Sequence, residues 1–346
     1  MRLTLRHRRE AMRLREPFRI SGYLFEAMPA VVVEIGDGRV TGRGEAAGVY
    51  YLDDDTAHME LAIEAVRSAV EAGASRQDLR TLLPAGGARN ALDCAMWERE
   101  SLASGTPVAQ LAGLGNPRPL VTTFTVPAVD PGEVESRLAA LDHAQSLKLK
   151  LEGDLDVDAE RLREVRRLRP ETWLAVDANQ GFHRDDLDRL AALLSEMRVS
   201  LLEQPVRRGS ERELEGWKCP IPIAADESIL DLNELAERHQ HFDVINLKLD
   251  KCGGLTEALM MAAEIRKLGK QIMVGNMAGS FLAAAPGFIL GQLCEVVDLD
   301  GPFFLVDQSA PDVIYKDGMI DVPAGMWGAG TNGPNTNLAD QPDSRS

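Results

Sequence analysis

The spacing of apolar and polar residues changes near residue 120 and divides the chain into two parts. Before that point, the segments at residues 30–35 and 40–45 flank a Gly-Asp-Gly sequence, which predicts a strand–turn–strand unit. Helical periodicity follows at residues 56–71 and 89–104, and Gly105 ends the second helix. Strands followed by helices predict an α+β module over residues 1–116.

After residue 117, short apolar segments recur and alternate with helical patterns. Eight strands are expected, at residues 120–126, 147–151, 173–177, 200–203, 222–226, 244–248, 271–275 and 295–298. Counted from Lys148 in the second strand, the ends of the later strands follow at intervals of 22 to 29 residues, which is the length of one strand and one helix. With seven helical patterns between the strands, residues 117–312 are predicted to form a parallel (β/α)7β barrel. A doubly wound sheet is less favoured, because no G-x-G-x-x-G follows an early strand.

The end of the chain follows neither pattern. Residues 313–330 come after the eighth strand, and we expect them to return to the first module. Residues 331–346 are rich in Asn, Pro, Asp and Ser and predict a mobile tail.

Residues 271–294 carry no charge over 24 positions, which is long enough to span a bilayer. Asn276, Ser280, Pro286 and Gln292 interrupt this segment. A strand at 271–275 followed by a buried helix at 278–293 explains it better than a membrane span.

The composition narrows the classes of function. The 346 residues are 45% hydrophobic and 27% charged, as in ordinary globular proteins. The net charge of −16 disfavours binding to nucleic acid or to anionic membranes. Four widely spaced cysteines indicate no disulfide framework. The charged N-terminus has no apolar segment behind it, so we expect no signal peptide and a cytoplasmic location.

Charged side chains gather at the ends of the predicted barrel strands, where chemistry takes place in this architecture. Side chains alternate along a strand, and the face toward the helices must be apolar. In the segment 147–151 the leucines therefore face the helices, and Lys148 and Lys150 project into the barrel mouth. The same logic directs Asn246, Lys248 and Asp250 inward on the sixth strand.

Three consecutive strands end in a carboxylate: Asp177, Glu203 and Asp226. A single aspartate at such a place usually caps the next helix. Three inward carboxylates together repel one another unless a cation joins them. Hard oxygen ligands of this kind suit Mg²⁺, and we expect one ion here.

The use of lysine points to proton transfer. The chain has thirty arginines and only eight lysines, yet Lys148, Lys150, Lys248 and Lys251 all lie at two strand ends. Lysine can lose its proton, whereas arginine effectively cannot. Lys150 on the second strand and Lys248 on the sixth would face each other across the metal. The expected reaction is a 1,1-proton transfer, with the metal stabilising an enediolate formed from a carboxylate-bearing substrate.

Asp298 and Asp300 end the eighth strand and are expected to face the metal across the barrel mouth. The sequence shows no obvious cation partner for them. An ammonium group of the substrate would satisfy them, and a dipeptide is the simplest molecule that joins an ammonium to a carboxylate at this distance.

These residues resemble the enolase superfamily, in particular its muconate-lactonizing-enzyme-like subgroup. The resemblance spans nearly the whole chain. The motifs that carry it are Pro17-Phe18, Asn90-Ala91-Leu92-Asp93 with Trp97, Lys148-Leu149-Lys150, Asp177-Ala178-Asn179, Glu203-Gln204-Pro205, Ala225-Asp226-Glu227-Ser228, and 246–251 before Gly253-Gly254. It implies an α/β fold in which a modified TIM barrel carries the α+β module as an N-terminal capping domain.

The Asp298-Leu299-Asp300 sequence is similar to that of the dipeptide epimerases of the L-Ala-D/L-Glu type. This resemblance implies that Lys150 and Lys248 are the acid–base pair and that Lys148 assists electrostatically. It also implies that Asp298 and Asp300 hold the amino terminus of the dipeptide. A small dipeptide is therefore the expected partner, and a homo-oligomeric state stays open.

One position departs from that pattern. Members that act on Ala-Glu carry an arginine four or five residues after Pro-Phe, where this chain has Gly22 and Tyr23. Either Arg19 takes over the contact with an acidic side chain, or the preferred second residue is not Glu. Tyr23 and Tyr50 are further candidates for substrate binding. Tyr50, Tyr51 and Asp53-Asp54-Asp55 lie in the matching loop of the capping domain and would favour side chains other than Glu, although a solvated loop and helix start explains this segment equally well.

Two alternatives to dipeptide epimerisation stay open: a different enolate-forming reaction, and metal binding without catalysis. The same fold supports N-acylamino acid racemisation, o-succinylbenzoate synthesis and cycloisomerisation, whose substrates lack the free ammonium that Asp298 and Asp300 would bind. In the second alternative, the barrel binds a metal ion but does not catalyse a reaction.

Overall fold

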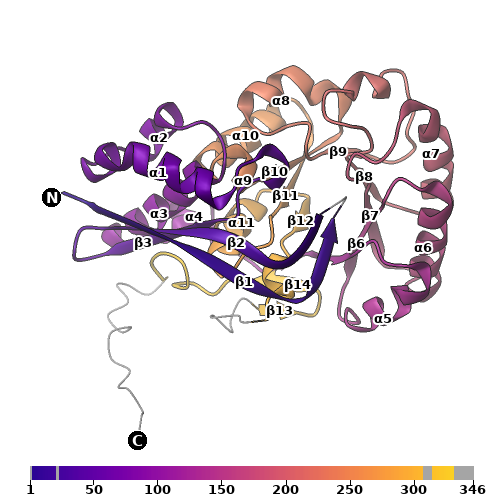
Figure 1. Ribbon diagram of the computed structural model, residues 1–346, viewed down its shortest axis with the longest axis horizontal. Helices are drawn as coiled ribbons and strands as arrows, with labels where there is room; N and C mark the ends of the chain where they lie inside the picture. Colours follow the sequence, from indigo (N-terminus) through magenta and orange to yellow (C-terminus); the bar gives the residue numbers. More distant parts are fainter. Residues whose placement is uncertain (1, 21–22, 307–313, 331–346) are drawn as a thin grey trace, which may run out of the picture.

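The computed structural model describes residues 2–20, 23–306 and 314–330, without the side chains of residues 18–20, 23, 24 and 314. The predicted mobile tail at 331–346 lies outside these residues. Figure 1 shows an N-terminal module beside a larger barrel ringed by helices.

The N-terminal module is an antiparallel sheet with helices packed on one face. Its strands are β1 (Thr4–Ile20), β2 (Tyr23–Gly36) and β3 (Thr41–Ala46), in that order. Its helices are α1 (Thr56–Glu71), α2 (Arg76–Leu82), α3 (Gly87–Ser104) and α4 (Val108–Leu111), with the short helical turn η1 (Tyr50–Leu52) before α1. A Cβ at Gly44 would lie 2.1 Å from the Ala91 carbonyl oxygen. Glycine on β3 therefore lets α3 lie directly against the sheet.

The barrel is an eight-stranded parallel sheet whose neighbours follow chain order from β5 to β12. Its strands are β5 (Thr123–Val126), β6 (Ser146–Lys150), β7 (Trp173–Asp177), β8 (Leu201–Glu203), β9 (Ile223–Ala225), β10 (Val244–Lys248), β11 (Gln271–Gly275) and β12 (Val296–Asp298). Side-chain bonds join its two ends, where the Leu299 N–H donates to Thr122 Oγ1 at 2.9 Å. The barrel predicted from the sequence is confirmed, as are the positions of its strands, except that residues 120–121 of the first predicted strand form β4 (Leu120–Val121) in a separate sheet.

Helices cover the outside of the barrel (Figure 1). They are α5 (Val134–Ala139), α6 (Leu155–Leu168), α7 (Leu187–Glu196), α8 (Leu232–Arg238), α10 (Leu255–Lys267) and α11 (Phe281–Gly291), and α9 (Leu249–Cys252) is a single turn after β10. The 3-10 turns are η2 (Pro131–Glu133), η3 (Arg184–Asp186), η4 (Glu211–Leu214), η5 (His239–His241) and η6 (Gly301–Phe304).

One predicted helix is absent: the connection from β8 to β9, which the structure describes throughout, contains only the η4 turn. Gly209 and Gly216 both have positive φ, and Pro220 and Pro222 precede β9. These residues interrupt any longer helix.

The uncharged segment resolves into a strand and a helix, as expected. Residues 271–275 form β11 and residues 281–291 form α11, which is buried along most of its length. Among the described residues, no helix is both long and apolar enough to cross a membrane.

The C-terminal segment joins the barrel to the N-terminal module. Strand β14 (Met319–Asp321) pairs on one side with β13 (Ile314–Lys316) and on the other with β4 (Leu120–Val121), which lies at the start of the barrel. Farther on, Trp327 Nε1 donates to the Arg43 carbonyl oxygen at 3.2 Å, and the Gly328 N–H donates to Glu98 Oε1 at 3.3 Å. The segment therefore contacts β3 and α3 and links them to the barrel.

Candidate active site

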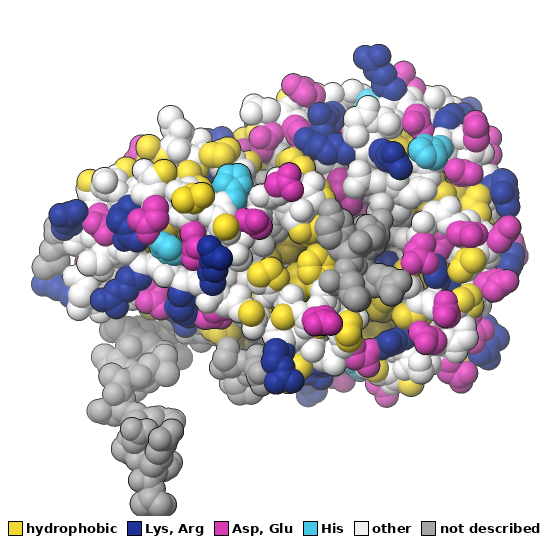
Figure 2. All heavy atoms as spheres, in the orientation of Figure 1, with side chains coloured by type: hydrophobic (Ala, Val, Ile, Leu, Met, Phe, Trp, Pro, Cys, Tyr) yellow, Lys and Arg dark blue, Asp and Glu magenta, His cyan; other side chains and the backbone are white. Residues whose placement is uncertain are grey.

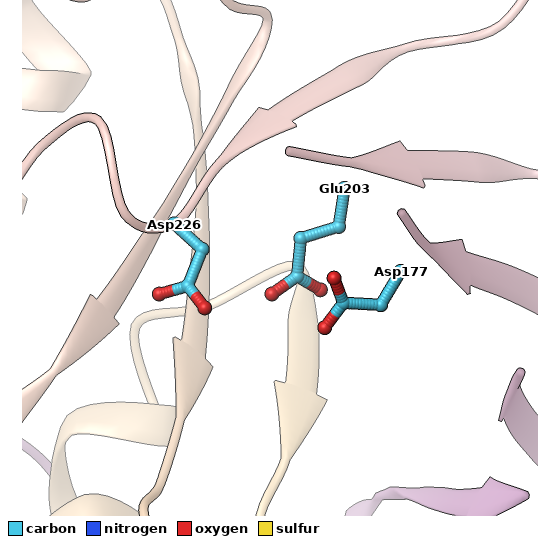
Figure 3. Close-up of side chains that lie close together, drawn as sticks. All are labelled: Asp177, Glu203 and Asp226. Carbon is cyan, nitrogen blue, oxygen red and sulfur yellow. The ribbon is translucent and has the colours of Figure 1, made fainter. Parts of the chain in front are cut away.

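Three carboxylates from neighbouring strands converge at the barrel mouth (Figure 3). Asp177 ends β7, Glu203 ends β8, and Asp226 follows β9. Each offers an oxygen atom, and the three oxygens lie within 4.8 Å of one another. All three side chains are buried, so they repel strongly unless positive charge joins them.

The pKa values reflect this crowding. Burial, together with the charge of Asp177, raises the pKa of Glu203 to about 7. Burial also opposes ionisation of Asp177, but Lys150 and Lys148 outweigh it and hold its pKa at about 2. Lys248 and Lys251 likewise hold the pKa of Asp226 below its usual range against burial. Three clustered oxygen ligands in a buried, negatively charged position fit Mg²⁺.

Lys150 and Lys248 approach the carboxylates from strands that lie four positions apart in the sheet. The Lys150 Nζ atom lies 2.5 Å from Asp177 Oδ2, and the Lys248 Nζ atom lies 2.6 Å from Asp226 Oδ2. Both side chains are buried and line the same cavity. Neither amine therefore points into bulk solvent, and the two reach the carboxylates from different sides of the barrel.

Lys148 connects the three carboxylates to the end of the eighth barrel strand. Its Nζ atom lies 2.8 Å from Glu203 Oε2, 3.1 Å from Asp177 Oδ2 and 2.9 Å from Asp298 Oδ2. Burial opposes its charge, but the surrounding carboxylates, Asp298 first among them, raise its pKa well above the usual value.

The expectation that Asp298 has no cation partner is therefore wrong. The sheet nearly closes, so only β5 separates β6 from β12, and the long side chain of Lys148 spans that distance. Asp298 also accepts a hydrogen bond from Thr123 Oγ1.

Asp300 is the freer member of the Asp-x-Asp pair. Its Oδ2 atom accepts a hydrogen bond from the Thr125 N–H at 2.7 Å, and its side chain lines the cavity. Burial and the charge of Asp298 raise its pKa to about 7. A cationic group in the cavity would relieve this cost.

Other polar side chains fix the orientation of the carboxylates. Lys251 Nζ donates to Asp226 Oδ1 at 2.6 Å and to the Asn246 carbonyl oxygen at 3.0 Å. Asn246 points inward, as expected, and its Nδ2 donates to Glu203 Oε1 at 2.9 Å.

Asp250 does not point into the barrel as the alternation predicts. The strand ends at Lys248, and the helical turn α9 then redirects the chain. The Asp250 carboxylate instead accepts a hydrogen bond from the Gly48 N–H at 2.9 Å. It thus anchors the segment of the N-terminal module that carries Tyr50 and Tyr51.

Of the proposed cap contacts, Tyr50 lines the cavity and packs edge-on against Phe25, with ring centroids 5.4 Å apart. The side chains of Arg19 and Tyr23 lie outside the described residues. Glu227 also lines the cavity and was given no role from the sequence, although it directly follows Asp226. It is buried, and its Oε2 atom has no hydrogen-bond partner among the described residues.

The chain matches two family models that together cover most of its length. Residues 2–113 match the N-terminal domain of the mandelate racemase / muconate lactonizing enzyme family, and residues 133–332 match the enolase C-terminal domain-like family. This chain belongs to the enolase superfamily. The resemblance inferred from its motifs is therefore confirmed.

Individual superfamily members are similar over most of the length of this one. The L-Ala-D/L-Glu epimerase of Escherichia coli (strain K12) is 33% identical, over 90% of this chain and 97% of that protein. An N-acetyl-D-glutamate racemase from a Pseudoalteromonas species is 35% identical, over 74% of this chain and 80% of that protein.

A solved structure gives the same picture. The dipeptide epimerase of Methylococcus capsulatus, complexed with Mg and the dipeptide L-Arg-D-Lys, has a TM-score of 0.85 and 30% identity to this superfamily member. The match covers 93% of this chain and 97% of that one.

Proposed function

We propose that this protein is a Mg²⁺-dependent dipeptide epimerase, an isomerase that inverts the α-carbon of the C-terminal residue of a dipeptide. The observation that carries the proposal is the placement of Lys150 and Lys248, which line one cavity from strands on different sides of the carboxylate cluster. Inversion requires that a proton leave one face of the carbon and that another arrive on the opposite face, and two amines so placed can serve both steps.

Each charged side chain then has a role. Asp177, Glu203 and Asp226 would hold Mg²⁺, which when bound offsets the negative charge that develops on the substrate carboxylate as the α-proton departs. Lys150 and Lys248 exchange protons with the α-carbon, one as the amine and the other as the ammonium. Lys148 adds positive charge beside that carboxylate.

Asp298 and Asp300 would bind the ammonium at the start of the dipeptide, which places the second residue between the two lysines. We also propose that residues 1–116 cap the mouth of the barrel formed by residues 117–312 and that residues 313–330 join the two. The proposed partner is a small dipeptide in the cytoplasm rather than a nucleic acid or a membrane.

One observation favours an alternative within the superfamily. Because Lys148 already pairs with Asp298, that carboxylate does not need a substrate cation, and an N-acylated amino acid without an ammonium could occupy the cavity. The alternative function is N-acylamino acid racemisation.

The test is α-proton exchange in D₂O, followed by NMR on L-Ala-L-Xaa dipeptides and on the matching N-acetyl-L-amino acids, with Mg²⁺ and with excess chelator. We expect Mg²⁺-dependent deuterium incorporation at the α-carbon of the second residue of the dipeptides. Faster exchange in the N-acetyl compounds would favour the racemase. Absence of exchange in every compound would indicate a barrel without catalysis.

A further inference from the structure

The cavity that holds the two lysines has one wall that the proposed chemistry leaves unexplained. It is made by the N-terminal module and by the segments that follow β11 and β12, and it is mainly apolar. Its members are Leu14, Phe25, Met28, Tyr50, Ala278 and Phe304. Figure 2 shows hydrophobic side chains gathered where the N-terminal module meets the barrel.

This wall is part of a packed cluster rather than a chance exposure. Leu14 and Met28 are buried and form a hydrophobic cluster with Leu305, against which Phe25, Ala278 and Phe304 pack. The backbone holds β1 in place, because Leu14 bridges to Leu305 and the Val306 N–H donates to the Arg13 carbonyl oxygen at 2.9 Å. The apolar surface is therefore fixed in position before a ligand arrives.

The geometry of the α-carbon decides which part of a substrate meets this wall. The substrate carboxylate would bind the Mg²⁺ held by Asp177, Glu203 and Asp226, and the α-proton would point at a lysine. Two substituents of the α-carbon then remain. The peptide nitrogen leads toward Asp298 and Asp300. The side chain of the epimerised residue is left to point out of the barrel, toward the N-terminal module.

We infer that this wall is the subsite for the side chain of the epimerised residue and that the residue is apolar, of the size of Leu, Met or Phe. The inference rests on the proposed function and adds the substrate class. An apolar side chain gains by leaving water for this surface, whereas a carboxylate or ammonium would lose its hydration there.

One buried carboxyl group in the cavity also disfavours an acidic substrate residue. Glu227 lines the same cavity and is buried, and its Oε2 atom has no hydrogen-bond partner among the described residues. A second carboxylate placed beside Glu227 would lose its hydration at a position where Glu227 Oε2 itself finds no donor among the described residues.

The experiment compares kcat/KM of the Mg²⁺-loaded protein for L-Ala-L-Leu, L-Ala-L-Met, L-Ala-L-Phe, L-Ala-L-Glu and L-Ala-L-Lys. We expect the apolar dipeptides to exceed the charged ones by about tenfold or more, the usual worth of a matched apolar contact. Equal or higher kcat/KM for L-Ala-L-Glu or L-Ala-L-Lys would overturn the inference while leaving epimerisation in place. Absence of turnover with all five would instead contradict the proposed function.

Two variants test the wall itself. Met28→Arg places a cation in it and is expected to shift the ratio of kcat/KM for L-Ala-L-Glu over L-Ala-L-Leu upward by about tenfold. Val306→Arg adds the same charge at an exposed neighbouring position that does not line the cavity, and it should keep the wild-type ratio. Circular dichroism and Tm establish that both variants fold. A folded Met28→Arg protein with an unchanged ratio would place the side-chain subsite elsewhere.

Discussion

The ammonium of Lys148 lies 2.9 Å from a carboxylate oxygen of Asp298 and so joins two groups of acidic residues across the barrel mouth. The same Nζ atom lies 2.8 Å from Glu203 Oε2 and 3.1 Å from Asp177 Oδ2. One buried cation therefore balances part of the proposed metal site and part of the proposed ammonium site. This shared position makes the two sites depend on each other.

Lys148→Met should destabilise the protein mainly when Mg²⁺ is absent. Removal of one member of a buried ionic cluster leaves the other charges unpaired, which costs about 3 kcal/mol of unfolding free energy. Bound Mg²⁺ would replace part of the lost positive charge, so the loss should shrink when the ion is in excess. Urea denaturation with chelator and with Mg²⁺ measures both values.

Lys267→Met is the matched control, because Lys267 pairs with Glu264 at an exposed position. The unfolding free energy of Lys267→Met should fall by less than about 1 kcal/mol, both with chelator and with Mg²⁺. An equal loss for Lys148→Met with and without Mg²⁺ would contradict the proposed sharing of charge.

Asp298→Asn and Asp300→Asn should have different kinetic effects on a dipeptide. Asp300 has no lysine within ion-pair distance among the described residues, so its replacement should chiefly raise KM. Asp298 also pairs with Lys148, so its replacement should lower kcat as well and reduce kcat/KM about 100-fold or more. Steady-state kinetics with one dipeptide measures both constants. Identical changes in kcat and KM for the two variants would show that the pair acts as a single unit.

Lys150→Ala and Lys248→Ala should each abolish epimerisation but leave α-proton exchange in one stereoisomer. The two amines reach the cavity from different sides, so each one serves one face of the α-carbon. With the L,L and L,D dipeptides in D₂O, one variant should exchange only the first and the other variant only the second. Exchange of the same isomer by both variants would place the two lysines on one face.

Asp93→Asn should change how stability depends on pH. Burial raises the pKa of Asp93 to about 6, against the hydrogen bonds that Thr256 donates to it. The folded protein then holds a proton that the unfolded chain releases near pH 4. Wild-type stability, relative to the variant, is therefore highest below pH 4 and falls as the pH rises to about 6, by on the order of 3 kcal/mol.

Urea denaturation of both proteins between pH 4 and 7 measures this difference. Since other groups titrate alike in the two proteins, the difference isolates Asp93. A difference that stays constant over this interval would show that Asp93 is ionised in the folded state.

The positions of the proposed catalytic residues could be predicted because strand alternation is a local rule. Side chains of a strand point to opposite faces, so the leucines beside Lys148 and Lys150 were enough to direct both lysines inward. The repeat of strand and helix lengths predicted the barrel, and the barrel placed Asp177, Glu203 and Asp226 side by side. Each step depends on residues near one another in the sequence.

The remaining features arise from contacts between distant segments, which no local pattern encodes. The pairing of Lys148 with Asp298 joins positions 150 residues apart and exists because the curved sheet nearly closes. The Asp250 carboxylate faces Gly48 because a helical turn interrupts the alternation after Lys248. Strand β1 was not predicted, and the apolar wall that it forms with β2 is held against the barrel by contacts between distant segments, among them the bridge from Leu14 to Leu305. The sequence by itself determined which groups can exchange protons and bind a cation, whereas the tertiary structure decided which charges share a partner and what surface a substrate side chain meets.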